Sequence, residues 1–396
     1  MKSDKTTPNV PTLRFKEFND SWYNESLGNI CFLSSGSTPS RAKGNNFAGD
    51  ICWLTSGELK SKWIYNTEEK ITKKSQYEYN LTLFPENTLV IAIYGLEAAG
   101  IRGTCGILKK PATISQACMA IQPKDNEISS EFLYSWYKKH GNLIGLKYAQ
   151  GTKQQNLCFD IVKELKVHYP SVVEQHKISA FIDKIDERIE IQNKIIEDLK
   201  ILKKELCNRV FSKGSAVRLS ELIEEVTIRN KSNTCDNVLS VSNKMGFIKQ
   251  SEQFEDRTIA SENKSNYKVV TKGCFAYNPA RINVGSIALL SSHSVGIISP
   301  MYVCFKAKNV LDSTYLSFYY QSDFFARELQ KKLEGSVRQC LTYENMREII
   351  IPYVNVERQR EIATALNRFT MLIATEEKCL KALQKQKSYF LNAMFI

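Results

Sequence analysis

Two carboxylates and a lysine near the start of the chain have the residue types of a metal-dependent nuclease. Asp50 is followed by Glu58-Leu-Lys60, and such a set offers two ligands for a divalent ion and a cation for a phosphate. The same residues fit charged turn positions after the apolar segment Ile51-Cys-Trp-Leu54, and the second half of the chain has no counterpart. We therefore favour the turn interpretation, assign no metal site and keep the nuclease as an alternative.

Asn278-Pro-Ala-Arg281 is the nearest match in the chain to the motif that holds a flipped amino group in adenine N6 methyltransferases. That motif reads Asn or Asp, Pro, Pro and an aromatic residue, and the second proline and the aromatic residue are missing here. The glycines at positions 95, 100, 103 and 106 lack the spacing of a cofactor loop, and no GxxxxGK[S/T] segment occurs. The sequence therefore predicts a non-catalytic chain with no catalytic residues and no cofactor of its own.

Four loop segments have the composition expected of a surface that contacts DNA. Arg, Lys, Asn and Gln read base edges, Lys, Arg and backbone amides bind phosphates, and glycine lets the backbone approach closely. The segments are 94–103 and 151–156 in the first half, and 277–283 and 335–339 in the second. The candidate DNA-binding residues are Tyr94, Arg102, Lys153, Gln154, Gln155, Tyr277, Asn278, Arg281, Asn283, Arg338 and Gln339. As an alternative, the arginines form salt bridges within turns and the amides cap turns.

The composition is that of a basic globular protein. The 396 residues carry a formal net charge of +12, from 54 Lys+Arg and 42 Asp+Glu, which is typical of proteins that bind polyanions but also fits a merely soluble basic protein. The 11 cysteines form no CxxC pair or zinc-spaced cluster. No signal peptide and no membrane-spanning apolar run is recognisable. We therefore expect a cytoplasmic protein with reduced thiols and no membrane partner.

An internal duplication organises these elements. Residues 14–211 are echoed by residues 218–395, so that Phe132-Leu-Tyr-Ser-Trp-Tyr137 matches Tyr315-Leu-Ser-Phe-Tyr-Tyr320 and Gly151 matches Gly335. Each half ends in a long helical pattern after Pro170 or Pro352. The rest of each half mixes short strands, such as 88–94 and 286–290, with one helix around 130–140 or 312–333. The predicted fold class is therefore α+β, with the order globule, long helix, globule, long helix.

The two helical patterns carry an apolar seam with the heptad spacing of a coiled coil. Apolar residues alternate by three and four positions, the two sets are offset by 184 residues, and Gln192, Lys203, Glu376 and Lys387 fill the gaps. An amphipathic helix lying on a globular core is the alternative. The seam consists of Ile178, Ile182, Ile185, Ile189, Ile196, Leu199, Leu206, Val210, Ile362, Leu366, Phe369, Ile373, Leu380, Leu383, Phe390 and Met394.

Over its whole length the chain resembles the specificity (S) subunit of a Type I restriction-modification system. The order of several motifs and the duplication carry the resemblance. The motifs are Leu13-Arg-Phe-Lys-Glu-Phe18 with Trp22 and Leu27-Gly28, Ile51-Cys-Trp-Leu-Thr-Ser-Gly57, Tyr277-Asn-Pro-Ala-Arg-Ile-Asn-Val-Gly-Ser286, Ile298-Ser-Pro-Met-Tyr-Val303 and the two helix openings after Pro170 and Pro352. The resemblance implies two target recognition domains, at 1–170 and 214–352. It also implies two long helices, at 171–213 and 353–396, that form an antiparallel coiled coil in a pseudo-twofold molecule.

The resemblance also implies the partners. We expect double-stranded DNA with a bipartite site, two methyltransferase (M) subunits and restriction (R) subunits. S-adenosylmethionine, ATP and Mg are then expected on the partner subunits, whose complex would methylate adenine N6 and cut DNA. A protein-binding coiled-coil scaffold without DNA specificity remains as the alternative, and the target DNA sequence cannot be read from these residues.

Overall fold

The chain folds as two compact units in a computed structural model that describes residues 9–42, 45–98, 100–151, 154–243, 245–253, 264–335 and 339–396. Unit 1 comprises Met1–Gln192 with Cys379–Ile396, and unit 2 comprises Asn193–Lys378. Each unit therefore contains one globule together with a segment of each long helix. Among the described residues, no helix is both long and apolar enough to cross a membrane.

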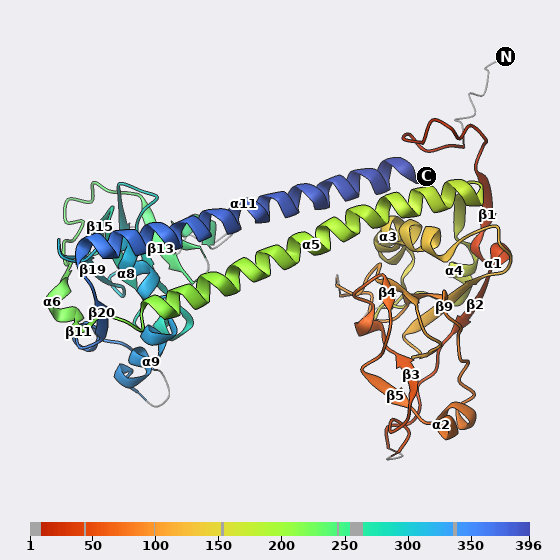
Figure 1. Cartoon of the computed structure of the whole chain (residues 1–396), viewed down its shortest axis with the longest axis horizontal. Helices are drawn as coiled ribbons and strands as arrows, with labels where there is room; N and C mark the ends of the chain where they lie inside the picture. Colours follow the sequence, from red (N-terminus) through yellow and green to blue (C-terminus); the bar gives the residue numbers. More distant parts are fainter. Residues whose placement is uncertain are drawn as a thin grey trace. The chain divides into compact units, whose positions relative to one another are not determined.

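Unit 1 is built on a five-stranded sheet with the order β2-β9-β6-β7-β4 and a three-stranded sheet with the order β5-β3-β8. Figure 1 shows β2 and β9 of the first sheet and β3 and β5 of the second. The central strand β6 is buried along its whole length and pairs antiparallel with both neighbours. The strands span Cys31–Ser35 (β2), Ile51–Leu54 (β3), Trp63–Ile64 (β4), Glu69–Ile71 (β5), Leu89–Ala92 (β6), Cys105–Leu108 (β7), Thr113–Ile114 (β8) and Cys118–Pro123 (β9). The five-stranded sheet positions the loop that follows β6. This loop contains candidate DNA-binding residues.

The helix α3, Ser130–Tyr148, packs against the five-stranded sheet. The Ser129 side chain caps its start by accepting a hydrogen bond from the Phe132 N–H, and Phe132 and Trp136 are buried. A small antiparallel sheet of β1 (Tyr23–Ser26) and β10 (Lys166–Tyr169) closes the globule. The short helices are α1 (Leu27–Ile30), η1 (Ser56–Glu58), α2 (Lys73–Glu78) and α4 (Phe159–Glu164).

Unit 2 repeats this plan with two four-stranded sheets, ordered β12-β19-β16-β17 and β14-β13-β18-β15, and the pair β11–β20. The parallel pairing of β13 with β18 matches that of β3 with β8. The strands span Ser215–Arg218 (β11), Ile223–Glu225 (β12), Val238–Ser242 (β13), Gly246–Lys249 (β14), Lys268–Thr271 (β15), Cys274–Tyr277 (β16), Ile287–Leu289 (β17), Val295–Ile298 (β18), Val303–Ala307 (β19) and Ile350–Tyr353 (β20). The predicted α+β class and the duplication are confirmed.

Unit 2 departs from the prediction in the helix expected around 312–333. Two helices occupy this segment, α8 at Ser313–Tyr319 and α9 at Asp323–Lys332. Ser322 separates them because its backbone is extended and its side chain accepts a hydrogen bond from the Phe325 N–H, which starts a new helix. The remaining helices are α6 (Leu219–Leu222), α7 (Gln250–Gln253), η2 (Ile282–Val284) and α10 (Tyr343–Arg347).

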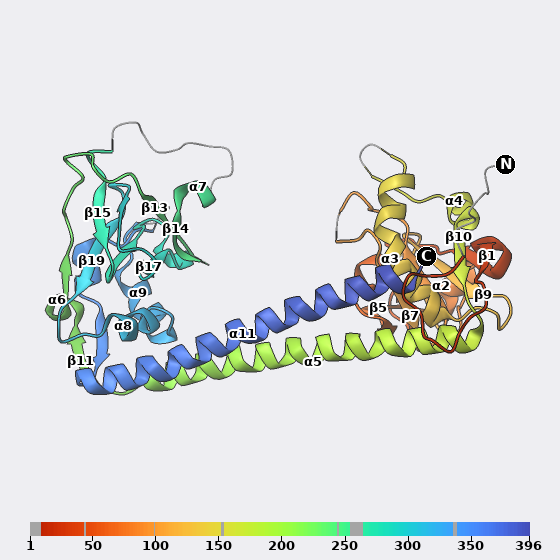
Figure 2. The ribbon, with the colours of Figure 1, turned by 90° about the horizontal axis from the view of Figure 1, so that it is seen from above.

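The two long helices are α5, Val172–Val210, and α11, Val356–Met394, and in each unit their segments run antiparallel. In unit 1 Phe181 of α5 packs edge-on against Phe390 of α11 at 4.8 Å between ring centroids, and Asp186 pairs with Lys387. Both views show the last turns of α11 beside the first turns of α5 (Figure 1 and Figure 2). In unit 2 Lys200 pairs with Glu377 at 2.7 Å.

None of the predicted seam side chains is exposed. Ile178 and Ile182 join the core of unit 1 together with Met394. Leu206, Val210, Ile362 and Leu366 are in the core of unit 2 or pack against it. The two helices are therefore coiled-coil partners and also walls of the globular cores, so the interpretations that the sequence left as alternatives both hold in part.

A buried glutamine fixes each long helix to its globule. The side-chain oxygen of Gln175 accepts a hydrogen bond from the Ser129 N–H at 2.9 Å, and its amide group donates to the carbonyls of Glu127 and Pro170. Gln359 makes the same three bonds, with the Asp312 N–H and the carbonyls of Val310 and Val354. Both side chains are 0% exposed. All six partners are backbone groups.

We expect Gln175→Ala to destabilise unit 1 by about 2–4 kcal/mol, because it leaves one N–H and two carbonyls without their partner in a buried place. The four tryptophans, Trp22, Trp53, Trp63 and Trp136, all lie in unit 1, so tryptophan fluorescence during urea denaturation reports on this unit. Gln154→Ala, the same substitution at an exposed position, is the control and should leave the transition in place. An equal shift for both variants would show that the buried hydrogen bonds contribute little.

Candidate nucleic-acid interface

The two candidate loops of unit 1 meet beside the end of β6. The Leu157 N–H donates to the Ile93 carbonyl at 2.8 Å, and the Leu96 N–H donates to the Gln155 carbonyl at 3.0 Å. Asn156 forms isolated bridges with both Tyr94 and Gln150. The described residues of segments 94–103 and 150–156 therefore form one surface, although more than forty residues separate the two segments in the sequence.

Two glycines shape this surface. Gly151 has φ +119°, and a Cβ there would lie 2.0 Å from the Gln154 carbonyl oxygen, so only glycine permits the turn. Gly95 has φ +75°, and a Cβ there would meet no atom within 4 Å. The positive φ at Gly95 would strain any residue with a Cβ. The space beside its Cα is open, so a ligand can approach the backbone closely at this position.

Arg102 holds its own loop. Its Nε donates to the Leu96 carbonyl at 2.9 Å, Nη2 approaches the Glu97 carbonyl at 3.3 Å, and the aliphatic part of the side chain lies against Gly145 of α3. The guanidinium has five N–H donors, so some remain for a phosphate or a base. The geometry assigns Arg102 a positioning role within the loop, and its DNA contact stays a prediction.

The other candidates of unit 1 differ in exposure. Gln154 is exposed, Gln155 is half-buried, and Tyr94 is half-buried against the core cluster. Lys153 lies outside the described residues. We therefore expect the side chains of Gln154 and Gln155 to be the more available readers, with Tyr94 supporting the loop.

Glu97 is a residue of this surface that the sequence analysis missed. It is exposed, and its Oε2 accepts a hydrogen bond from the Gln155 N–H at 2.9 Å. This bond, together with the residue's own N–H, lowers the pKa of the carboxyl group. The signal for Glu97 in the sequence is its place between Gly95 and Arg102, but an acidic residue does not fit a pattern of cationic and amide side chains.

In unit 2 the same two loop positions also meet. The Leu341 N–H donates to the Pro279 carbonyl at 3.1 Å, and Glu334 and Cys340 exchange two backbone hydrogen bonds across the turn at Gly335. Gly335 has φ +96° and occupies the place of Gly151. The second pair of loops therefore repeats the construction of the first.

Tyr277 and Asn278 are inside this second surface. Tyr277 is 0% exposed, and its hydroxyl has no hydrogen-bond partner among the described residues; burial raises its pKa. The Asn278 side-chain oxygen accepts a hydrogen bond from the Ala280 N–H at 3.1 Å. Both residues therefore shape the loop in this structure, and their contact with DNA remains a prediction.

Arg281, Asn283 and Gln339 are exposed on the second surface. Arg281 starts the 3₁₀-helix η2 with its backbone, and the structure gives its guanidinium no partner among the described residues. Arg338 lies outside the described residues. Arg281 is therefore freer to contact DNA than Arg102, despite their similar places in the two loops.

Glu58, one of the three nuclease-like residues, is bound within its own turn. Glu58 Oε2 accepts hydrogen bonds from the N–H and the hydroxyl of Thr55, at 2.9 and 2.7 Å, and Oε1 accepts one from the Glu68 N–H at 2.7 Å. These three donors occupy both oxygens of the carboxylate. The geometry therefore supports the turn interpretation of this segment.

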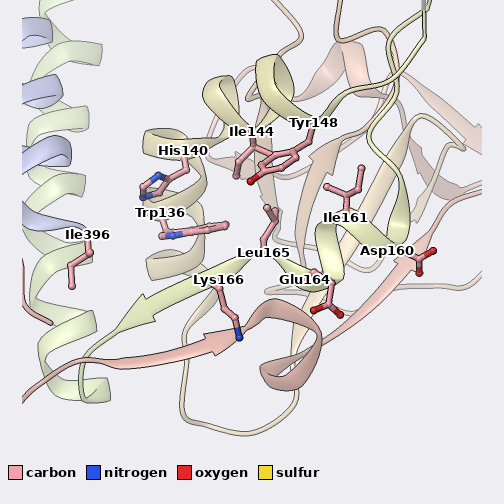
Figure 3. A pocket seen from close by; sticks show the side chains of 10 residues that line it. All are labelled: Trp136, His140, Ile144, Tyr148, Asp160, Ile161, Glu164, Leu165, Lys166 and Ile396. Atoms are coloured by element: carbon pink, nitrogen blue, oxygen red, sulfur yellow. The ribbon is translucent and has the colours of Figure 1, made fainter. Parts of the chain in front are cut away.

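A pocket of about 570 Å³ lies in unit 1 between α3 and α4 (Figure 3). Trp136 and His140 lie on its α3 side, and Asp160 and Glu164 on its α4 side. Burial, with a contribution from Lys139, lowers the pKa of His140 to about 4, so the imidazole is neutral at physiological pH. The described residues that line this pocket include no serine, threonine or cysteine beside His140, so a hydroxyl or thiol nucleophile paired with this imidazole is missing there.

The fold and the two surfaces define a class: a duplicated α+β protein in which each unit presents a pair of loops that meet in one surface. Residues 19–200 and 217–385 match the family model described as "Type I restriction modification DNA specificity domain". The chain belongs to this family. A coiled-coil scaffold without DNA specificity is therefore not favoured.

Individual relatives agree with the family. The Type I restriction enzyme MjaIX specificity subunit of Methanocaldococcus jannaschii is 32% identical over 187 residues, which are 46% of this chain and only 42% of that relative. The MjaVIII specificity subunit of the same organism is 22% identical over 342 residues, 78% of each chain. The crystal structure of a Type I restriction-modification system S subunit from M. genitalium has a similar fold, with a TM-score of 0.57, 17% identity and coverage of 98% of this chain and 99% of that one.

Proposed function

We propose that this chain is the DNA-recognition subunit of a Type I restriction-modification complex and that each unit reads one half of a bipartite site. The observation that carries the proposal is the repeated surface: in each unit two loops, joined by backbone hydrogen bonds, meet at the end of the corresponding strand, β6 or β16. Membership of the DNA specificity family supports the same assignment.

Recognition would divide the work between the residues of each surface. Gln154, Gln155, Asn283 and Gln339 carry amide groups that can donate to and accept from base edges. Arg281 is placed to contact a guanine or a phosphate, while Arg102, Tyr94, Tyr277 and Asn278 keep the loops in shape. The net charge of +12 favours the approach to the phosphate backbone and makes affinity decrease with salt.

The chemistry would belong to the partners. We assign adenine methylation with S-adenosylmethionine to two methyltransferase subunits, and ATP- and Mg-dependent cleavage to restriction subunits. The lack of a complete adenine-pocket motif at Asn278-Pro-Ala-Arg281 supports this division. In this proposal the chain works in the cytoplasm and supplies sequence specificity and docking surfaces only.

We expect the purified chain alone to transfer no methyl group from labelled S-adenosylmethionine to DNA. Addition of the partner methyltransferase subunits should produce transfer confined to one bipartite sequence, because only the complex has both chemistry and recognition. The partner subunits without this chain are the control and should show no such specificity. Robust transfer by the lone chain, abolished by Asn278→Ala, would overturn the proposal and make Asn278-Pro279 part of an active site.

A further inference from the structure

Glu97 is an exposed carboxylate on the surface formed by the two loops of unit 1, to which the proposed function assigns one DNA half-site. On such a surface a negative charge repels phosphates, and it is favourable only where it faces a hydrogen-bond donor. The donors that duplex DNA presents in the major groove are the exocyclic amino groups of cytosine and adenine, and Glu and Asp pair with cytosine N4. The chemistry of a carboxylate at this position therefore favours a base contact over a phosphate contact.

The structure holds this carboxylate in place from both loops. Leu96, the preceding residue, is 1% exposed, and its N–H and carbonyl bind the Gln155 carbonyl and the Arg102 Nε. The Glu97 carboxylate accepts the Gln155 N–H at 2.9 Å. These hydrogen bonds hold both Leu96 and the Glu97 carboxylate, so they limit the rotamers of Glu97. The entropy cost of a directed hydrogen bond from Glu97 to a ligand is therefore reduced.

The carboxylate keeps free acceptor capacity. An ionised carboxylate offers about four acceptor positions, and the N–H groups of Gln155 and of Glu97 itself use two of them. The lowered pKa means that the group stays ionised, and therefore acceptor-only, at physiological pH. The side chain of the neighbouring Gln154 is exposed on the same surface.

We propose that Glu97 is a specificity-determining residue of unit 1, which accepts a hydrogen bond from the exocyclic amino group of a cytosine in the half-site that this unit reads. The inference rests on the proposed function, because it needs unit 1 to bind DNA. It goes further in naming the residue, the chemical group that it recognises and the base.

Glu97→Gln separates base reading from loop support. The amide oxygen of the glutamine can still accept the Gln155 N–H, so the link between the loops is kept. The free group then becomes an NH₂ donor in place of an acceptor. A base that offers an acceptor in the major groove (guanine, thymine, or adenine through N7) should therefore be preferred where the wild-type chain prefers cytosine.

The test uses the chain assembled with its partner methyltransferase subunits and a library of DNA duplexes with a randomised half-site. We expect Glu97→Gln to lower the preference for cytosine at one position by about tenfold and to leave the other positions unchanged. Glu86→Gln is the matched control: it removes the same charge from an exposed turn before β6, whereas Glu97 follows that strand. It should leave every preference unchanged.

The outcomes are distinguishable. An unchanged preference at every position, or an equal loss of binding on all sequences, would overturn the inference and leave Glu97 as a loop support. A wild-type assembly without any sequence preference would instead contradict the proposed function. Glu97→Ala, which removes both the charge and the link between the loops, should lose the cytosine preference and also weaken binding generally. Retention of that preference by Glu97→Ala would contradict the inference as well.

Discussion

Replacement of residues 1–170 by the corresponding segment of another specificity subunit is expected to change one half of the recognised site completely and to leave the other half unchanged. Both loops of the first surface, 94–103 and 150–156, lie within this segment, and both loops of the second surface lie outside it. Methylation-sensitive sequencing of DNA from cells that express the chimera, together with its partner subunits, reads both halves directly.

The reciprocal chimera is the control for this experiment. Exchange of residues 214–352 carries the second pair of loops and should alter only the other half-site. The two chimeras should therefore give complementary results. Changes in both halves from a single exchange would mean that the units do not read DNA independently.

Insertion of seven residues into both long helices is expected to lengthen the spacer between the half-sites by about 3 base pairs. One heptad adds about 10 Å of helix while keeping the phase of the seam, and base pairs follow one another at about 3.4 Å. The insertions belong after Gln192 in α5 and after Lys378 in α11, where the chain passes between its two units. A library of sites with variable spacers, tested for methylation by the assembled complex, measures the change.

The matched control places the seven residues in α5 alone. That variant shifts the seam of α5 against α11 beyond the insertion, so it should fail on every spacer. Retention of the original spacer at wild-type efficiency by the double insertion would show that these helices do not set the distance between half-sites.

The apolar seam of the two long helices and the duplication could be predicted from the sequence, because both are repeating patterns of residue type. The seam residues recur every three or four positions and again after 184 residues, so their burial follows from pattern alone. Gln175 and Gln359 share that offset too, yet a polar residue in a helical pattern is normally placed on the solvent face. Their burial depends on backbone groups of the globule, which only the folded chain brings into reach.

In the candidate interface, residue type does not predict which side chains point into the core and which are exposed. Arg102 and Arg281 are the same residue in similar loops, but Gly145 opens a space on α3 beside Arg102 and its side chain turns inward. Tyr277 is buried, whereas Tyr94 is half-buried. The direction of each side chain depends on the packing opposite it, and the meeting of the two loops depends on the sheet. Neither the direction of a side chain nor the contact between the two loops can be predicted from the residues of one loop alone.

The glutamine at the start of each long helix has a consequence for how such proteins diversify. Its hydrogen bonds all go to main-chain atoms, so this part of the joint depends on the backbone shape of the globule, whereas the Arg14–Glu174 pair and the core contacts of Ile178 and Ile182 beside it depend on particular side chains. We therefore expect a recombined gene to accept a foreign globule at the helix boundary when that globule keeps the backbone shape, a partner for Glu174 and the apolar contacts of the helix. Under the proposed function, such an exchange would give a lineage a new target sequence in a single event and leave both long helices unchanged.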